Sequence, residues 1–285
     1  MNQANTSKRD AVTAVAEAYY DSTDADNFYF NIWGGEDIHI GLYEETSDIA
    51  EASRRTVAHM ADHIPDLNAD TRIIDLGAGY GGAARYLAHN FSCEAVCLNL
   101  SDVQNATNRR LNAEQGLDDL IRVVHGSFEE IPEPDESFDV VWSQDAILHS
   151  GNREQVVAEA WRVLKPGGIM VFTDPMQADD CPPGVLQPVY DRIHLESLGS
   201  FGFYQDISAK QGFTDFTKED LTHNLRTHYS RVRDELERDY ERMAKVSSKD
   251  YIDRMLVGLG NWVQAADSGY LAWGIIGFRK PVPVS

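Results

Sequence analysis

A carboxylate and a histidine stand four residues apart in the segment WSQDAILHS, at Asp145 and His149. An aspartate can hold a cation by its charge, and a histidine can accept a proton near neutral pH. If residues 143–150 begin a helical turn, this spacing places both side chains on one face. The pair predicts a site that binds and deprotonates an amine. It is equally typical of an aspartate that caps a helix beside a buried, hydrogen-bonded histidine.

A glycine-rich segment is the second candidate for chemistry. Residues 72–82 read RIIDLGAGYGG, an apolar run that leads into glycines and then into a helical pattern. Gly77 and Gly79 permit a tight turn and let a ligand lie against the backbone. The amides at the start of the helix would then face that ligand. Together with Gly82, they also satisfy G-x-G-x-x-G, which is typical of dinucleotide sites.

Two features of the neighbouring strands favour S-adenosylmethionine (SAM) over a dinucleotide. Asp75 directly precedes the glycines, where it would repel a pyrophosphate but could hold the ammonium end of SAM. The next strand ends at Asn99, without the acid expected on a dinucleotide ribose, although its amide can still bind hydroxyls. We expect SAM as the cofactor, and a nicotinamide dinucleotide remains the alternative.

Other residues near the expected strand ends belong to the same predicted cofactor site. Ser127 and Phe128 follow the third strand, where a hydroxyl and a flat ring could contact an adenine, and Gln144 directly follows the fourth. The full expected set at the cofactor from this region is Asp75, Gly77, Ala78, Gly79, Asn99, Leu100, Gln104, Ser127, Phe128 and Gln144.

Alternating strand and helix patterns must position these residues. Such alternation predicts an α/β fold, a mostly parallel Rossmann-like sheet with helices on both faces. We expect an N-terminal helical cap (1–66), a SAM-binding core (67–220 and 269–285) and a helical lid (221–268) inserted before the last strand. Strands are expected near 72–76, 94–99, 120–125, 138–142, 168–173 and 270–280, and helices near 8–20, 47–63, 81–89, 102–115 and 153–163; one further helix and strand are expected within 204–218.

The charge excludes some classes of partner. With 46 acidic against 25 basic residues, the net charge of −21 would repel nucleic acid and anionic membranes. It indicates either an ordinary acidic protein or adaptation to concentrated salt, which screens self-repulsion. The absence of an apolar run long enough to cross a bilayer, and of a secretion-type N-terminus, favours a cytoplasmic location.

Neither the cysteines nor the histidines are expected to bind a metal. Cys93 and Cys97 lie in an apolar strand pattern and show no C-x-x-C spacing, so burial is expected rather than a disulfide. Methyl transfer requires no metal, and no cysteine cluster accompanies the nine histidines.

Six segments go beyond this general class. FYFNIWGGEDIHIGLY, DLGAGYGGAARYL, CLNLSDVQN, WSQDAILHS, RVLKPGG and TDPM together resemble the sarcosine/dimethylglycine N-methyltransferases, over about residues 19–280. The resemblance implies stepwise methylation of sarcosine and dimethylglycine to the osmolyte glycine betaine. It places Tyr20 and Trp33 near SAM, His39 at its methionine carboxylate, and Asp145 and His149 at the amine. WSQDAILH is also similar to phosphoethanolamine methyltransferases, so another small amine remains an alternative acceptor.

An amino-acid acceptor also needs its carboxylate held. Arg192 lies in the region expected to cover the site, and its planar guanidinium can bind both carboxylate oxygens. A surface ion pair with Asp191 or Glu196 is the competing interpretation. Tyr204, His228 and Tyr229 are weaker candidates for substrate contact in the lid.

Overall fold

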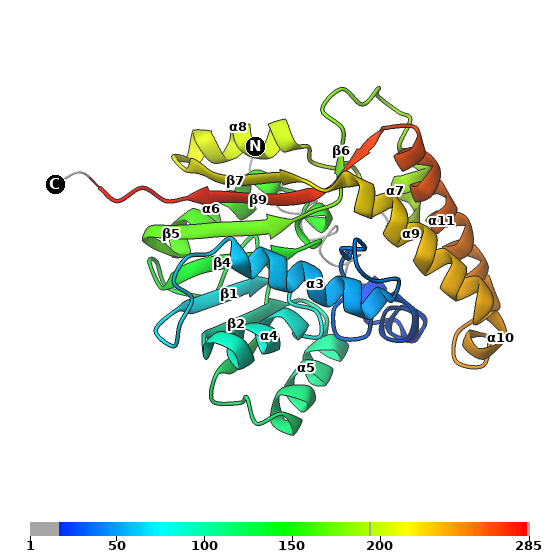
Figure 1. Ribbon diagram of the computed structural model, residues 1–285, viewed down its shortest axis with the longest axis horizontal. Coiled ribbons are helices and arrows are strands. Elements are labelled where there is room, and N and C mark those ends of the chain that lie inside the picture. Colours follow the sequence, from blue (N-terminus) through cyan, green and yellow to red (C-terminus); the bar gives the residue numbers. More distant parts are fainter. Residues whose placement is uncertain (1–16, 194, 284–285) are drawn as a thin grey trace, which may run out of the picture.

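The computed structural model describes residues 17–193 and 195–283 of the chain, which form a central seven-stranded sheet flanked by helices (Figure 1). The strand order is β3-β2-β1-β4-β5-β9-β7. The first five strands along the chain pair in parallel, and β9 runs antiparallel to both of its neighbours. The seven strands are β1 (Arg72–Leu76), β2 (Glu94–Asn99), β3 (Ile121–His125), β4 (Phe138–Gln144), β5 (Leu164–Thr173), β7 (Thr214–Asp220) and β9 (Gly274–Arg279).

The central strands are buried on both faces, which their apolar runs predict for a covered parallel sheet. Ile73 and Val171 belong to a cluster that faces the cap and the lid, whereas Ile74 and Phe172 face a second cluster on the other side. The helices that flank these strands are α3 (Ile49–Asp62), α4 (Gly82–Phe91), α5 (Asp102–Glu114), α6 (Arg153–Val163) and α8 (Phe201–Gln211).

Local capping chemistry sets where these helices begin. Ser101, Asn152 and Ser200 each accept a hydrogen bond from a backbone amide two or three residues ahead, at the starts of α5, α6 and α8. Before α4, Gly81 takes a left-handed conformation (φ 80°), where an added Cβ would overlap the side chain of Asn108. The helices therefore begin directly at the edge of the sheet where the site residues lie.

The lid is a set of helices packed on one another beyond that edge. It contains α9 (Thr222–Arg238), α10 (Tyr240–Met243) and α11 (Lys249–Asp267), and α7 (Gln187–Ile193) packs against α11. The last strand, expected over 270–280, is split: β8 (Leu271–Ala272) pairs with β6 (Met176–Gln177) before β9 begins.

The cap contains two short elements, α2 (Thr23–Phe28) and a π-helical turn η1 (Tyr29–Trp33), followed by an irregular segment. Carboxylates connect it to both neighbours. Asp21 accepts a hydrogen bond from the Ser101 hydroxyl of the core (2.6 Å), and Asp24 accepts one from the Ser248 hydroxyl at the start of α11 (2.6 Å). We name Asp21 and Asp24 the cap latches.

The fold class is as predicted, and the expected strands and helices agree with the structure within a few residues, except that β5 begins at Leu164 rather than 168. The helix expected over 8–20 lies mostly outside the described residues. α7, expected within the core, packs with the lid instead because its buried face meets α11. Cys93 and Cys97 are buried and unpaired, as expected.

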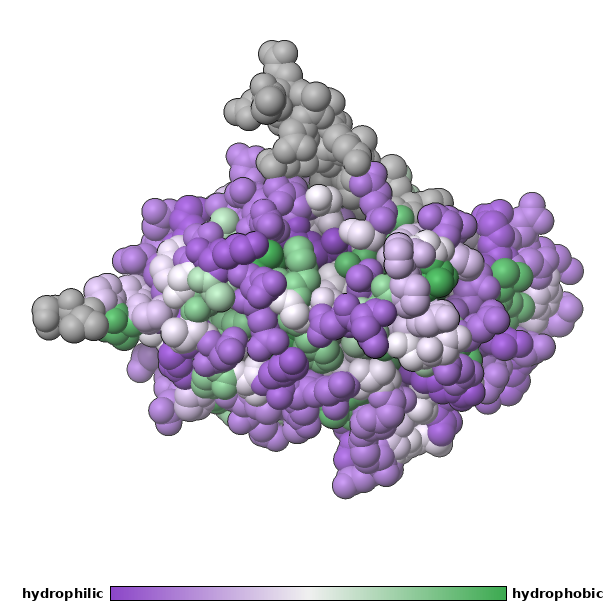
Figure 2. All heavy atoms as spheres, turned by 90° about the horizontal axis from the view of Figure 1, so that it is seen from above, coloured by the Kyte–Doolittle hydropathy of each residue, from purple (hydrophilic) through white to green (hydrophobic). Residues whose placement is uncertain are grey.

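The surface matches the composition. Hydrophilic residues cover most of the face seen from above, and hydrophobic ones form only small scattered patches (Figure 2). None of the helices among the described residues is long and apolar enough to span a membrane.

Candidate active site

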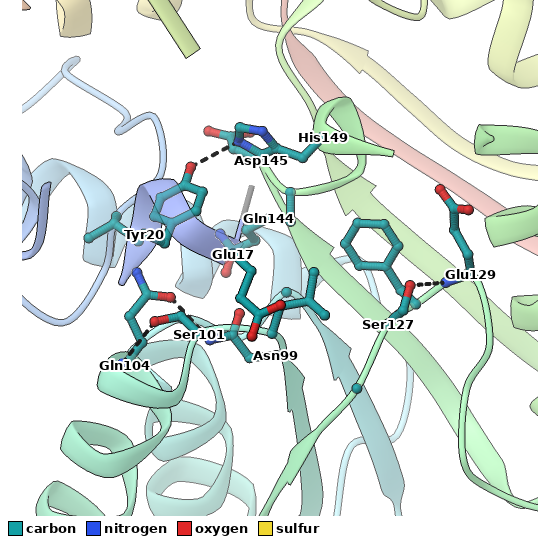
Figure 3. A pocket seen from close by; sticks show the side chains of 17 residues that line it. Glu17, Tyr20, Asn99, Ser101, Gln104, Ser127, Glu129, Gln144, Asp145 and His149 are labelled. Carbon is teal, nitrogen blue, oxygen red and sulfur yellow. Dashed lines mark hydrogen bonds between the residues drawn. The ribbon is translucent and has the colours of Figure 1, made fainter. Parts of the chain in front are cut away.

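A cavity of about 770 Å³ opens at the carboxyl ends of β1, β2 and β4, which is where open α/β sheets bind ligands (Figure 3). Eleven of its lining residues were expected from the sequence: Tyr20, Gly77, Gly79, Asn99, Leu100, Gln104, Ser127, Phe128, Gln144, Asp145 and His149. The cap also contributes Glu17 and Ile38.

The glycine loop is shaped by positive φ angles. Gly77 has φ 76° and Gly79 has φ 53°, conformations that side chains rarely adopt. A Cβ on Gly77 would overlap that of Ala146, and one on Gly79 would lie 3.4 Å from Ile38. The loop therefore needs glycine for backbone conformation and for close packing on both sides of the cavity.

Opposite the glycines, an amide pair forms a polar wall. The Asn99 side chain donates to Gln104 Oε1 at 3.0 Å, and both residues are almost fully buried. Gln104 is held in turn because its backbone amide donates to the Ser101 cap. The Asn99 amide on this wall suits ribose hydroxyls.

A smaller adjoining cavity of about 300 Å³ contains the acidic end of the site. It is lined by Asp75, Ala78, His39 and Gln144 together with Asp37. Burial raises the pKa of Asp75 to about 7; nearby His39 lowers it and Asp37 raises it. Buried Nε2 atoms of His39 and Gln144 have no hydrogen-bond partner among the described residues. This combination of an acid and the free donor of Gln144 suits the ammonium and carboxylate of an amino-acid group.

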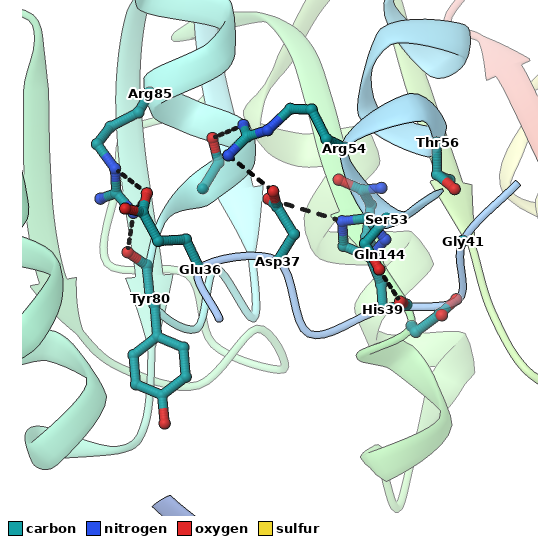
Figure 4. Close-up of polar contacts among 12 residues, drawn as sticks. Glu36, Asp37, His39, Gly41, Ser53, Arg54, Thr56, Tyr80, Arg85 and Gln144 are labelled. Atoms are coloured by element: carbon teal, nitrogen blue, oxygen red, sulfur yellow. Dashed lines mark hydrogen bonds and ion pairs between the residues drawn. The ribbon is translucent and has the colours of Figure 1, made fainter. Parts of the chain in front are cut away.

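Helix α3 holds the wall of this smaller cavity. Arg54 pairs with Asp37 (Nη2–Oδ2 2.8 Å), while the hydroxyls of Ser53 and Thr56 donate to the carbonyls of His39 and Ile40 (Figure 4). The irregular cap segment is thus fixed by side chains of one helix face.

Asp145 does not stand on a helix. Its backbone is left-handed (φ 50°), and only a short 3-10 turn, η2 (Ile147–His149), follows. Its two carboxylate oxygens accept hydrogen bonds from the Ile40 amide (2.7 Å) and Trp273 Nε1 (2.8 Å). The expected helical face shared by Asp145 and His149 is therefore wrong, because the chain turns sharply between them. Both side chains nevertheless line the same cavity.

His149 is neutral at physiological pH. Burial, with the charges of Arg192 and Arg153, lowers its pKa to about 3, so it is a weaker base than the sequence indicated. Its Nε2 lies 2.9 Å from the Tyr20 hydroxyl in a hydrogen bond (Figure 3). That contact brings the cap directly onto the expected reaction centre.

Tyr204 is not among the described residues that line the cavity, so its expected contact with substrate is wrong. It is buried against Phe172, and its hydroxyl donates to Asp174 at 2.6 Å. Asp174 accepts the Leu148 amide at 2.9 Å. Through Asp174, Tyr204 therefore supports the turn that carries His149.

Arg192 is surrounded by aromatic rings rather than by acids. Its guanidinium carbon lies 5.4–5.6 Å from the ring centres of Trp33, Tyr229 and Trp262. Its Nε and Nη1 are buried and have no hydrogen-bond partner among the described residues. The surface ion pair considered for Arg192 does not form with Asp191, which bonds Gln187. Trp33, expected at the cofactor, belongs to this group instead and is not among the residues lining the large cavity.

Further unpaired donors lie in the same region. Trp33 Nε1, Trp262 Nε1 and His228 Nε2 are all buried without a partner. Burial lowers the pKa of His228 to about 3, and its Nδ1 accepts the Gly41 amide at 3.2 Å, so the neutral ring carries its proton on Nε2. Since every one of these groups is a donor, they fit an anion.

Sequence reasoning did not find several site residues. Trp262, Asp37 and Glu17 lie in segments with ordinary helical or irregular patterns, and only the fold brings them to the site. His228 was considered only as a weak lid candidate, since a single histidine in a charged helix carries no distinct signal.

Known proteins share these features. Residues 74–172 match the family model described as a methyltransferase domain. A sarcosine/dimethylglycine N-methyltransferase from Aphanothece halophytica is 55% identical over 275 residues, which cover 96% of this chain and 99% of that protein. The chain belongs to the sarcosine/dimethylglycine N-methyltransferase family. Another such enzyme, from Halorhodospira halochloris, is 53% identical and covers 95% of this chain and 98% of its own.

The fold agrees with this family. A crystal structure from Galdieria sulphuraria, provisionally assigned as a sarcosine dimethylglycine methyltransferase, superposes with a TM-score of 0.88 at 42% identity, over 93% of this chain and 100% of that one. As a class I methyltransferase the chain uses SAM as its methyl donor, so the nicotinamide alternative is wrong. The glycine loop, the Asn99–Gln104 wall and the Asp75 cavity fit SAM by their donors, acids and open backbone.

Proposed function

We propose that this chain methylates the nitrogen of sarcosine and dimethylglycine, giving glycine betaine. The observation that carries this substrate choice is the group of buried, unpaired donors around Arg192. A small amino acid has one carboxylate, and a single guanidinium with neutral donors matches one negative charge. The nearby Arg153 is already engaged by Ser197 and the Leu148 carbonyl, so its guanidinium is less available than that of Arg192 for a phosphate dianion.

The amine would lie between this anion site and the cofactor cavity. Tyr20 lines the large cavity and bonds His149, and the charge of Arg192 reaches both side chains. A carboxylate held at Arg192 therefore directs the attached nitrogen toward Asp145 and His149.

We assign the catalytic work of the chain to positioning and to deprotonation. SAM, when bound, supplies a methyl group on a sulfonium cation. A free alkyl amine is nearly all protonated at neutral pH, yet only its neutral form has a lone pair to attack. The cation of Arg192 disfavours the ammonium form, so the amine loses its proton to solvent as it binds, and neutral His149, held by the Tyr20 hydroxyl, can accept a hydrogen bond from an N–H that remains. Asp145, fixed by Ile40 and Trp273, then stabilises the cation that forms as the N–C bond is made.

The experiment is product analysis by mass spectrometry with SAM and, separately, glycine, sarcosine, dimethylglycine and phosphoethanolamine. Betaine formed from sarcosine or dimethylglycine is the expected result. Methylation of phosphoethanolamine alone would overturn the proposed substrate while leaving the methyltransferase assignment intact. Binding of SAM with no methylated product from any of the four would show that the acceptor is a different compound.

A further inference from the structure

Two histidines and a glutamate converge on the outer side of α3, in a place that methyl transfer does not use. His59 and His63 stand one turn apart on α3, and Glu219 lies near the end of β7. Glu219 Oε2 is 2.7 Å from His59 Nε2 and 3.1 Å from His63 Nε2. The expectation of no metal site overlooked this H-x-x-x-H pair, and the glutamate comes from a segment some 160 residues later.

Both imidazoles direct the same ring atom at one carboxylate oxygen. The ring centres lie 5.2 Å apart, and the potential ligand atoms of the three residues all lie within 4.8 Å of one another. Among residues 17–193 and 195–283 this is the one group of three or more such side chains close enough to share an ion. The three side chains are 26–37% exposed, so an ion from solvent can reach them.

The hydrogen bonding of His63 favours a ligating form. Its Nδ1 lies 3.3 Å from the Thr217 hydroxyl, which can accept a hydrogen bond from that nitrogen. Nε2 of a neutral ring then presents a lone pair toward Glu219, and two lone pairs that face each other need a positive charge between them. Histidines that bind metals commonly donate their other N–H to such a neighbouring acceptor.

We propose that His59, His63 and Glu219 bind a divalent transition-metal ion of the zinc type, with water completing the coordination. Two histidines and one carboxylate form an established zinc ligand set, with bonds of about 2.0–2.2 Å. Ligand atoms around a tetrahedral ion lie about 3.3 Å apart, so the distances of 2.7 and 3.1 Å from Glu219 Oε2 to the two histidines must each lengthen by less than about 1 Å.

The bound ion would join α3 to the edge strand of the sheet. Helix α3 lies across the sheet in Figure 1, and its earlier residues Ser53, Arg54 and Thr56 hold the wall of the smaller cavity. The site would thus fix the helix that holds the wall of the smaller cavity, although none of its three ligands lines either cavity described above.

The test is titration of the tag-free, full-length protein with Zn²⁺ by calorimetry, together with Co²⁺ absorption spectra. We expect one ion per chain and a melting temperature raised by about 5 °C at about a hundredfold excess over Kd. His59→Ala, His63→Ala and Glu219→Gln should each weaken binding by at least about tenfold, and Thr217→Val by about tenfold. His89→Ala, at an exposed histidine on α4, is the matched control and should bind as the parent does.

Two results would overturn the site. One is binding that the three ligand variants, shown to be folded by circular dichroism, leave unchanged. The other is the absence of saturable Zn²⁺ or Co²⁺ binding in the parent protein while histidine NMR signals show His59 and His63 protonated near neutral pH. The cluster would then be an ion pair between protonated histidines and the Glu219 carboxylate.

Discussion

The cofactor side of the site, which we call the cofactor wall, and the group proposed to hold the amino-acid substrate, which we call the amine wall, differ in how far apart in the chain their residues lie. The cofactor wall (Gly77, Gly79, Asn99, Gln104, Ser127) comes from about fifty consecutive residues of one parallel sheet. The amine wall (Trp33, Arg192, His228, Tyr229, Trp262) is assembled from the cap and three lid helices. The first depends on backbone conformation and the second on side chains that meet only after folding. Substitutions should therefore affect the two walls in different ways.

The largest effect is expected on the cofactor wall. Gly77→Ala adds a Cβ that overlaps Ala146 and demands a left-handed conformation at φ 76°. Relief of the overlap should cost about 2–3 kcal/mol in SAM binding, which lowers affinity roughly a hundredfold. Calorimetry with SAM measures this loss.

Gly116→Ala is the matched control for Gly77. Gly116 has a similar φ of 67°, but an added Cβ meets nothing within 4 Å. This variant should lose about 1 kcal/mol of stability and keep its SAM affinity. Equal SAM affinity in both variants would show that neither the left-handed conformation of Gly77 nor the overlap with Ala146 matters for binding the cofactor.

On the amine wall, Arg192→Met should separate binding from stability. The change removes the cation proposed to hold the substrate carboxylate, at a cost of about 1.5–3 kcal/mol, or roughly 10–100-fold in kcat/KM for dimethylglycine. SAM affinity should stay the same. Because Arg192 is buried and has no acidic partner among the described residues, the empty protein should melt at the same or a higher temperature.

Arg226→Met is the control for Arg192, since Arg226 forms an exposed ion pair with Asp267 on the outer side of the lid. It should leave kcat/KM unchanged. An Arg192→Met enzyme with normal KM for dimethylglycine, or one that unfolds at lower temperature, would argue for a purely structural arginine.

Acid should weaken the cofactor wall through Asp75. Since burial raises the pKa of Asp75 to about 7, the carboxylate protonates as the pH falls through 7 and loses its attraction for an ammonium group. SAM affinity should fall about tenfold per pH unit below that value, and binding at pH 6 should release a proton. The sign for stability is opposite: the buried charge destabilises the empty protein above pH 7, so Asp75→Asn should raise its melting temperature at pH 8.

Asp75→Asn also tests the origin of that pH dependence, because Asp174 has a similarly raised pKa of about 7 caused by burial. At pH 8 the variant should bind SAM more weakly than the parent does. Its own affinity for SAM should be the same at pH 6 and at pH 8. If the tenfold change per unit persists in Asp75→Asn, another group is responsible.

The smallest effect is expected where the two walls meet. Tyr20→Phe removes the hydroxyl 2.9 Å from His149 Nε2, a loss of about 1 kcal/mol that should lower kcat about fivefold. Tyr240→Phe removes a comparable exposed hydrogen bond to Asp253 and should have no effect on kcat. Steady-state kinetics at saturating SAM measures both effects. Equal kcat values for Tyr20→Phe and the parent would show that the Tyr20 hydroxyl takes no part in the reaction.

The same contrast explains what the sequence could predict. Gly77, Asp75 and Asn99 follow apolar strands at fixed positions, so their place at one sheet edge follows from the pattern. Arg192 was a candidate only because an amino acid needs a cation, and its aromatic neighbours come from residues 33 to 262, which no local pattern connects. The helical face assumed for Asp145 and His149 was wrong because spacing cannot reveal a left-handed residue. Trp33 and Tyr204 were misplaced because an aromatic ring reads the same in a core and in a site.

The cap latches have a kinetic consequence. One short segment binds the core through Asp21 and the lid through Asp24, and directly before Asp21 the Tyr20 hydroxyl bonds His149. Opening of this one segment would therefore uncover both the SAM cavity and the site proposed for the acceptor. Release of the product and binding of the next SAM would then both require the same opening. Turnover can therefore be limited by the rate at which this segment opens rather than by the methyl transfer itself.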